Sequence, residues 1–334
     1  LVVGRESLPL SQALGRVLAE DVIAKRANPP LPNTAVDGYG FAGAVAEGAH
    51  VMPLVAGRAA AGLAYEGVVP AGHAIRILTG AALPTGVETV ILEEDVTLEA
   101  GEIAFHGPLK RGANTRKAGE DVAAGDVILQ AGRVITPADL LALLGEMGFV
   151  SVDLGRVRDD RAALQDRLNA AVGEVDVILT SGGASAGDED HVSALLRESG
   201  ALQEWRIALK PGRPLALAMW QGVPIFGLPG NPVASLVCTL IFGRPAMGLM
   251  AGASWQAPQG FDLPAGFAKR KKPGRREYLR ARIRQGQVEV FKSEGSGRIS
   301  GLSWAEGLVE LGDDAADIQP GDPVRFIPYG SFRL

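Results

Sequence analysis

The chain is poor in cysteine, histidine and aromatic residues, with one cysteine, four histidines and 5% aromatics among 334 residues. The single Cys238 lies in an apolar stretch with helical spacing, so we interpret it as a buried structural thiol rather than a nucleophile. One cysteine provides no disulfide framework, and we expect a reducing, cytoplasmic setting. The histidines show no metal-ligand spacing, which disfavours a structural zinc site.

Long apolar runs and an excess of basic residues are missing as well. No stretch of eighteen apolar residues occurs, so we expect no membrane span, and the first residues do not resemble a signal peptide. A net charge of −5 and the scarcity of aromatic residues argue against a general nucleic-acid binder. The composition therefore favours a globular protein.

Several motifs of common enzyme classes are absent or incomplete. The chain has no G-x-x-x-x-G-K-[ST] and no G-x-G-x-x-G, which excludes P-loop ATPases and gives a Rossmann dehydrogenase no support. Gly183–Gly187 matches the G-x-S-x-G nucleophile elbow around Ser185. A serine hydrolase also needs a later histidine, and the last one, His191, follows Ser185 on the adjoining predicted helix. The triad cannot close, so we reject this reading.

The region 175–239 does contain two successive strand–loop–helix units. The first reads VDVILT, SGGASAG and DEDHVSALLRESG, and the second reads VPIFGL, PGNP and VASLVCTLIFG. Between them lie two strand-like pieces joined by the basic turn Lys210–Arg213. This pattern predicts an α/β sheet with ligand loops at the strand ends. We expect the glycine-rich, acidic and basic loops to meet along one edge of the sheet.

The glycine-rich loop and the acids after it predict a phosphate site. Small residues at a helix N-terminus bring backbone N–H groups close to a phosphate. The acidic run Asp188–Asp190 would repel that phosphate unless a cation stands between them, and Mg²⁺ prefers such oxygen ligands. Asp159 and Asp160 either face the same crevice or cap the following helix.

Two further loops carry candidate ligands. Lys210 and Arg213 flank a Pro-Gly turn and suit a dianionic oxyanion or a phosphate. Pro229 and Pro232 stiffen the chain around Asn231, which we predict to cap the next helix.

The flanking regions differ from this central one. Helical spacing predicts helices over 10–24 and 136–147, whereas 48–129 and 253–334 consist of short strand patterns separated by turns. Asp37-Gly38 reads as a hairpin turn. A sheet of the predicted type would open with a further strand and helix after Asp153, and this segment is missing. Either the sequence joins only the ordered residues of a longer chain, or it carries a natural or engineered deletion.

Taken together, these motifs resemble the molybdopterin molybdenumtransferase family, which includes MoeA and the E domain of gephyrin. They occur in the family's order over nearly the whole chain: NTAVDGYGFA, ILTGAALPTG, SGGASAGDED, LKPGRP, GLPGNPVAS, RREYLRARI and GSGRISGLSWAEGLVEL. The family's S-T-G-[DS]-E-L motif is not found, and it belongs in the segment that is missing near Asp153.

The resemblance implies a multidomain α/β plus β fold with four domains. These are an elongated helical linker domain (1–38 and 122–150), a β-rich insertion domain (39–121), a three-layer α/β molybdopterin-binding domain (151–252) and a C-terminal β-barrel (253–334). It further implies a cytoplasmic homodimer that converts adenylylated molybdopterin and molybdate into the molybdenum cofactor and AMP with Mg²⁺, without nucleic acid or membrane as a partner.

The resemblance also assigns roles to individual residues. Asp190 and one of Asp159 and Asp160 would hold Mg²⁺ or position phosphates, and Lys210 and Arg213 would bind molybdate or the terminal phosphate. Arg213 departs mildly from the lysine that is frequent in the family. The other expected site residues are Asp37, Thr79 and Asp121 from across the dimer interface, Ser181, Gly182, Gly183, Ser185 and Gly187 of the glycine-rich loop, Pro229 and Pro232, and Arg276 and Ser300 of the C-terminal domain.

Two alternatives stay open. A molybdopterin adenylyltransferase shares the α/β domain and its SGGxSxG loop, but the two large β-rich flanks argue against it. A non-catalytic dimeric scaffold would keep the dimer surfaces while losing the acids, and here the acids outside the missing segment are present.

Overall fold

The computed structural model describes residues 4–9, 12–13, 15–135, 149–155, 157, 160–181, 191–198, 203–212, 214–293, 295 and 298–332. The chain forms two compact units, Glu20–Ala131 and the combination of Leu1–Ala19 with Gly132–Leu334. We treat each unit by itself. The four predicted domain boundaries stay predictions, and the predicted helix 136–147 lies outside the described residues.

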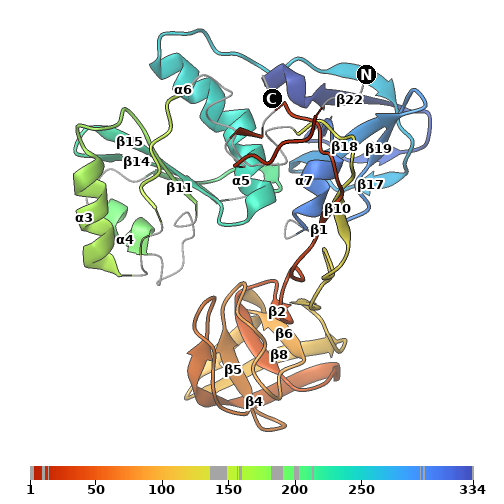
Figure 1. The fold of residues 1–334 in the computed structure, drawn as a ribbon. Helices are drawn as coiled ribbons and strands as arrows, with labels where there is room; N and C mark the ends of the chain where they lie inside the picture. Colours follow the sequence, from red (N-terminus) through yellow and green to blue (C-terminus); the bar gives the residue numbers. More distant parts are fainter. Residues whose placement is uncertain are drawn as a thin grey trace. The chain divides into compact units, whose positions relative to one another are not determined.

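The smaller unit is built around a six-stranded sheet with the order β6-β3-β5-β4-β8-β7 (Figure 1). All its neighbouring strands are antiparallel except β4 and β5. Its elements are β1 (Val22–Ile23), β2 (Asn33–Thr34), β3 (Gly38–Phe41), β4 (Val45–Ala59), β5 (Ala74–Ile77), β6 (Thr89–Leu92), the 3-10 turn η2 (Glu93–Asp95), β7 (Val96–Glu99), β8 (Glu102–Leu109), β9 (Thr115–Arg116) and β10 (Val127–Leu129). The prediction of strands over 48–129 is confirmed, but β4 is 15 residues long and not short.

Asp37-Gly38 is not a hairpin turn, contrary to the sequence-based expectation. Gly38 is the first residue of β3 and pairs with both β5 and β6. A Cβ atom at Gly38 would overlap the carbonyl oxygen of Ile91, so the glycine allows close approach of two strands instead of a tight turn. Asp37 is thereby fixed at the start of a buried central strand.

The predicted helix over 10–24 is wrong for the residues that the structure describes there. Gly15 has a φ of +73°, which is left-handed and incompatible with a continuing helix. The chain pairs instead with the segment that returns from the smaller unit, because the N–H groups of Gly15 and Leu18 donate to the carbonyls of Ile135 and Arg133, both at 2.9 Å. Farther along, β1 pairs with β10. These long-range hydrogen bonds replace those that a helix would have formed.

The larger unit contains the predicted α/β sheet, with the order β11-β15-β14-β12. Strands β11 and β15 are parallel, as two successive strand–loop–helix units require, and β14 and β12 continue the sheet antiparallel. The elements here are α3 (Arg161–Ala171), β11 (Ile178–Ser181), α4 (His191–Glu198), β12 (Gln203–Arg206), β13 (Leu209–Lys210), β14 (Pro214–Trp220), β15 (Val223–Leu228), α5 (Pro232–Cys238), the π-helix η3 (Thr239–Gly243) and α6 (Arg244–Met250).

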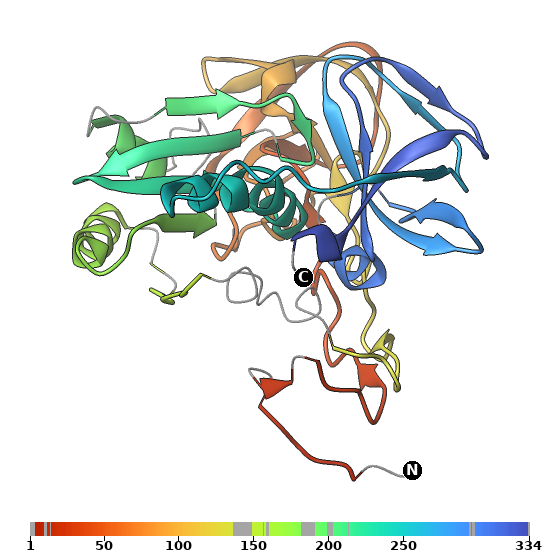
Figure 2. The same cartoon turned by 90° about the horizontal axis from the view of Figure 1, so that it is seen from above.

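Helices cover both faces of this sheet. Leu168 of α3 and Leu196 of α4 pack with Ile225 of the sheet in one core, whereas Leu228 packs with α5 and the C-terminal strands in another. Both views draw α5 next to the green strands of this sheet and next to the blue C-terminal strands (Figures 1 and 2). The α/β sheet and the C-terminal sheet therefore share a core.

The helical segment Pro232–Met250 is long and apolar enough to cross a membrane by length and composition, with a mean hydropathy of 1.6. Of this window, 61% is buried inside the molecule. A mostly buried apolar helix is what the core of a large protein contains, and we interpret the segment in that way.

The C-terminal region forms a second six-stranded sheet, with the order β13-β18-β20-β22-β16 and β19 beside β18. A bridge between Ala265, just after β16, and Val288 of β19 brings its two sides together. Its elements are β16 (Phe261–Pro264), β17 (Lys269–Lys271), β18 (Arg276–Arg284), β19 (Gln287–Val290), α7 (Ser300–Trp304), β20 (Gly307–Leu311), β21 (Ala316–Ile318), β22 (Pro323–Pro328) and the 3-10 turn η4 (Tyr329–Phe332). The strands predicted within 253–334 are present, and the short helix α7 was missed.

Candidate functional site

Three strand ends that carry the candidate loops meet at one edge of the α/β sheet. Ser181, the last residue before the glycine-rich loop, pairs with Leu228, the last residue before Pro229. Strand β14 runs antiparallel to β15, so its first residue, Pro214, lies at this same edge directly after the basic turn. The expectation that the loops share an edge is confirmed for the strand ends. Gly182, Gly183, Ser185, Gly187, Asp190 and Arg213 lie outside the described residues.

The basic turn does not simply join two strands of one sheet. β12 and β14 pair with each other in the α/β sheet, but β13 between them pairs in parallel with β18 of the C-terminal sheet. Leu209 lies opposite Arg276, and Lys210 lies opposite Glu277. The chain therefore crosses from one sheet to the other at the position where Lys210 stands.

The turn packs tightly against α5. Gly212 has a φ of +110°, and a Cβ atom there would lie 2.7 Å from the Sγ of Cys238. The Cys238 thiol donates to the carbonyl of Gly212 at 3.7 Å. Cys238 is buried, as predicted, and burial raises the pKa of its thiol to about 12, which keeps it protonated at neutral pH. Its place is in the packing of the turn.

The loop between β15 and α5 also has the predicted form. Asn231 caps α5, because its Oδ1 accepts hydrogen bonds from the N–H groups of Val233 (3.0 Å) and Ala234 (3.3 Å). Pro232 occupies the first helical position, where a missing N–H is harmless. Together with Pro229, these contacts fix the backbone next to the basic turn.

Lys210 belongs to a cluster of charges that the sequence did not reveal. Its Nζ lies 3.5 Å from Oε1 of Glu277, and the Nζ of Lys269 lies 3.1 Å from Oε2 of the same carboxylate. The side chains of Glu277 and Lys269 are 10% and 11% exposed, whereas that of Lys210 is 36% exposed. One carboxylate is thus shared by two ammonium groups, and the more accessible one belongs to the candidate site. The motif RREYLRARI contains Glu277, but its role depends on a strand pairing that local pattern does not specify.

Arg276 lies on the other face of β18. Neighbouring residues of a strand point to opposite faces, so Arg276 and Tyr278 point away from Glu277 and Lys210. The structure therefore does not bring Arg276 and Lys210 together. The role that resemblance gives to Arg276 stays a prediction.

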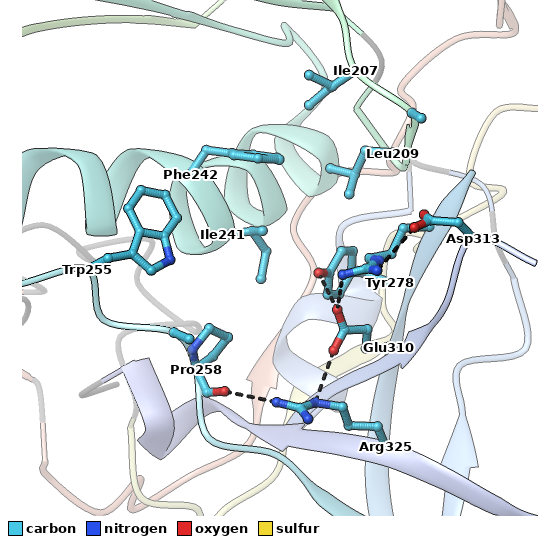
Figure 3. A pocket seen from close by; sticks show the side chains of 13 residues that line it. Ile207, Leu209, Ile241, Phe242, Trp255, Pro258, Tyr278, Glu310, Asp313 and Arg325 are labelled. Carbon is cyan, nitrogen blue, oxygen red and sulfur yellow. Dashed lines mark hydrogen bonds and ion pairs between the residues drawn. The ribbon is translucent and has the colours of Figure 1, made fainter. Parts of the chain in front are cut away.

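On that face, Arg276 lines a cavity of about 610 Å³. The cavity has an apolar side, with Phe242, Ile241 and Trp255, and a polar side, with Tyr278, Glu310 and Arg325 (Figure 3). All the lining residues belong to the larger unit. Its volume is in the range of small-molecule pockets, but its opposite charges balance.

Glu310 is the centre of the polar side. It accepts from Tyr278 Oη (2.8 Å) and pairs with Arg276 Nη1 (3.2 Å) and Arg325 Nε (3.0 Å). Arg276 Nη2 also pairs with Asp313 (3.1 Å), and Arg325 Nη2 donates to the carbonyl of Pro258 (3.2 Å). Burial, together with the bond to Glu310, raises the pKa of the Tyr278 hydroxyl, which therefore stays a donor. This network occupies both guanidinium groups with protein acceptors.

Ser300, the other expected C-terminal residue, is the first residue of α7. The loop before it is held by Arg280, which is 5% exposed and donates to the carbonyls of Ser293 (2.6 Å) and Gly295 (3.1 Å). The role of Ser300 in the site stays a prediction.

In the smaller unit, two of the three expected residues form a pair. Asp37 Oδ1 accepts from the backbone N–H (2.7 Å) and the hydroxyl (2.8 Å) of Thr79. Asp121 accepts from Nδ2 of Asn28 at 3.1 Å, and its own N–H donates to the carbonyl of Asn28 at 3.0 Å. These residues stand in the unit that the resemblance places across a dimer interface, and that placement remains a prediction.

The expected magnesium ligands are only partly covered by the described residues. Within that part of the chain, no group of three or more His, Cys, Asp or Glu side chains is arranged to hold a metal ion. Asp160 caps α3, because its Oδ1 accepts from the N–H of Ala163 at 2.8 Å, so the capping alternative is the one the structure supports. Asp159 and Asp190, the other two expected ligands, lie outside the described residues.

Family models match three stretches of the chain. The "MoeA N-terminal region (domain I and II)" matches residues 2–148, the "Probable molybdopterin binding domain" matches 123–248, and the "MoeA C-terminal region (domain IV)" matches 262–329.

Two curated relatives cover nearly the whole chain. The molybdopterin molybdenumtransferase of Haemophilus influenzae is 31% identical over 379 positions, covering 97% of this chain and 94% of the relative. Molybdopterin molybdenumtransferase 2 of Mycobacterium tuberculosis is 29% identical, covering 96% and 94%. A solved structure titled a molybdopterin biosynthesis MoeA protein, from Pyrococcus horikoshii, is 24% identical with a TM-score of 0.47, covering 96% and 93%. The first alignment is longer than the 334 residues of this chain, so that relative has residues without a counterpart here.

Proposed function

Because the chain belongs to the molybdopterin molybdenumtransferase family, we propose that it transfers molybdenum to molybdopterin in the synthesis of the molybdenum cofactor. Its substrates are then molybdate and molybdopterin in its adenylylated form, and the products are the molybdenum cofactor and AMP. The adenylylated form of the substrate is an inference from the resemblance.

The observation that carries this proposal is the meeting of three strand ends at one edge of the sheet, with Lys210 on the turn before one of them. The strand end at Ser181 carries the glycine-rich loop, Pro229 follows the neighbouring strand end, and the basic turn lies next to both. An accessible ammonium group beside backbone loops suits a tetrahedral oxyanion such as molybdate or a terminal phosphate. Arg213, on the same turn, is the second proposed cation.

Cleavage of a phosphoanhydride needs neutralised charge and aligned groups more than a protein nucleophile. In this chain Lys210 supplies a positive charge, and the packing of Gly212 on Cys238 fixes the turn that holds it. Mg²⁺, when bound, would neutralise phosphate charge. We assign it to Asp190 and Asp159 by resemblance alone, because Asp160 caps α3.

The proposed assembly is a homodimer in which Asp37, Thr79 and Asp121 reach the site of the partner subunit. The hydrogen bonds from Thr79 fix the orientation of the Asp37 carboxylate, which supports a role in positioning a bound group. A cytoplasmic setting and the absence of nucleic-acid or membrane partners remain predictions from composition.

The direct test incubates the purified protein with adenylylated molybdopterin, molybdate and Mg²⁺. We expect AMP and active molybdenum cofactor in equal amounts, and Asp190→Asn should abolish both while the molar mass in solution stays that of the dimer. Adenylylation of free molybdopterin by ATP would instead place the protein at the neighbouring adenylyltransferase step. A folded dimer that releases no AMP would favour the scaffold alternative.

A further inference from the structure

Glu277 is a buried carboxylate next to Lys210, the proposed oxyanion ligand. It lies in β18 directly opposite Lys210 of β13, and the residue is 8% exposed. Its two oxygens lie 3.5 Å from Lys210 Nζ and 3.1 Å from Lys269 Nζ. Oε2 makes no directed hydrogen bond within the described part of the chain, although it is close to Lys269. The carboxylate therefore holds both ammonium groups by charge and distance.

The carboxylate of Glu277 lies next to two ammonium groups, those of Lys210 and Lys269. Lys269 is the closer and more buried partner, whereas Lys210 is farther away and more accessible. Of the two ammonium groups, that of Lys210 is therefore the one that an incoming oxyanion can reach more easily.

A carboxylate partner such as Glu277 restricts the side chain of Lys210, which is a flexible four-carbon stem. The backbone of its turn is fixed by the contact between Gly212 and Cys238, but this contact does not hold the ammonium group. Loss of Glu277 would remove a contact that restricts the rotamers of this ammonium group.

From this geometry we propose that Glu277 is a positioning residue, which holds the ammonium of Lys210 toward the oxyanion substrate. Lys269 keeps the same carboxylate from neutralising Lys210 fully. The inference rests on the proposed function, because it takes Lys210 as a ligand of molybdate. It adds Glu277 and Lys269 to the residues on which molybdate binding depends.

Charge alone predicts the opposite result from positioning, which makes the test decisive. Glu277→Gln keeps the side-chain volume and removes the negative charge. If Glu277 only neutralised Lys210, the variant would bind molybdate more tightly. If Glu277 positions Lys210, KM for molybdate should rise about fivefold, the upper end of what one partly exposed charge contact contributes, while kcat changes less.

Partial unfolding lowers the fraction of active protein, which reduces the apparent kcat and leaves KM unchanged. A rise in KM therefore distinguishes positioning from a merely structural role. Glu277→Gln also strands the buried Lys269. The double variant Glu277→Gln/Lys269→Met removes that stranded charge, and its KM for molybdate should stay raised. In the background of Lys210→Met, Glu277→Gln should add no further change in KM, because it acts through Lys210.

The matched control is Glu289→Gln, which removes a carboxylate from the neighbouring strand β19, where Glu289 pairs with Arg282. Its KM should equal that of the wild type. An unchanged or lowered KM in folded Glu277→Gln and in the double variant would overturn the inference. If the wild-type protein itself makes no cofactor from molybdate, the proposed function fails first, and this outcome is distinct from the other.

Discussion

On each face of the C-terminal sheet, two cations share one carboxylate: that of Glu277 in β18, which is buried, and that of Glu310 in β20, which is half-buried. On one face Glu277 meets Lys210 and Lys269, at 3.5 and 3.1 Å, without a directed hydrogen bond at Oε2. On the other face Glu310 accepts from Tyr278 and pairs with Arg276 and Arg325 at 2.8 to 3.2 Å. The charges are alike, but the geometry differs.

The difference in geometry indicates two roles, a ligand site around Glu277 and a structural network around Glu310. A guanidinium group has five donors in a rigid plane, and those of Arg276 and Arg325 also pair with Asp313 and the carbonyl of Pro258. An ammonium group is a point charge on a flexible stem, which can shift its bonds to an incoming anion. We therefore expect substitutions on the Glu277 face to change activity and those on the Glu310 face to change stability.

The largest expected effect is that of Lys210→Met. Loss of a cation that contacts the oxyanion should lower kcat/KM for molybdate about 100-fold, as removal of one charge-stabilising donor does in other enzymes. Glu277 would keep Lys269 as its partner, so the free energy of unfolding should change little. Steady-state kinetics and urea unfolding measure the two quantities. An equal loss of stability and activity would remove the distinction between the faces.

Glu310→Gln should have the reverse effect. It weakens the bonds to Arg276 and Arg325 around a side chain that is 16% exposed, and should lower the free energy of unfolding by about 2 kcal/mol. KM for molybdate should stay at the wild-type value. The matched control is Glu289→Gln, whose more exposed pair with Arg282 should contribute less than about 1 kcal/mol. Equal losses in both variants would contradict the assignment of Glu310 as the centre of a structural network.

Gly212→Ala tests whether the backbone of the basic turn must stay in place. The Cβ of the new alanine would lie 2.7 Å from the Sγ of Cys238, and the φ of +110° is unfavourable for alanine. We therefore expect the free energy of unfolding to fall by about 2 kcal/mol. Gly222→Ala is the matched control, because its φ of +88° is also positive but its Cβ would meet open space. A larger loss at Gly212, partly relieved by Cys238→Ala, would isolate the clash from the backbone strain. Equal losses would mean that the turn adapts.

Sequence reasoning found the parts of this site that local pattern determines. The strands that end at Ser181 and Leu228 are apolar runs before glycine or proline, and the cap at Asn231 follows from its place before Pro232. The pairing of β13 with β18 could not be found in this way, since two residues carry no strand signal of their own. Without that pairing, neither the contact of Glu277 with Lys210 nor the position of Arg276 on the opposite face of β18 could be predicted.

The same limit explains the wrong helix over 10–24. Its spacing is helical, but the hydrogen bonds of Gly15 and Leu18 go to the segment that returns from the smaller unit. Local pattern gives the propensity of a segment, whereas partners distant in sequence decide where its backbone hydrogen bonds form.

Arg276→Gln should have the smallest effect and tests the comparison most sharply. Arg276 is 44% exposed, and Glu310 would keep Arg325 and Tyr278 as partners, so the loss of stability should stay below about 1 kcal/mol. The side chain points away from Lys210, and KM for molybdate should therefore stay within about twofold of the wild-type value. A tenfold rise in KM, measured at equal stability, would mean that Arg276 reaches the substrate, as the family resemblance implies. The Glu310 face would then belong to the substrate site, and the distinction between a ligand site and a structural network would fail.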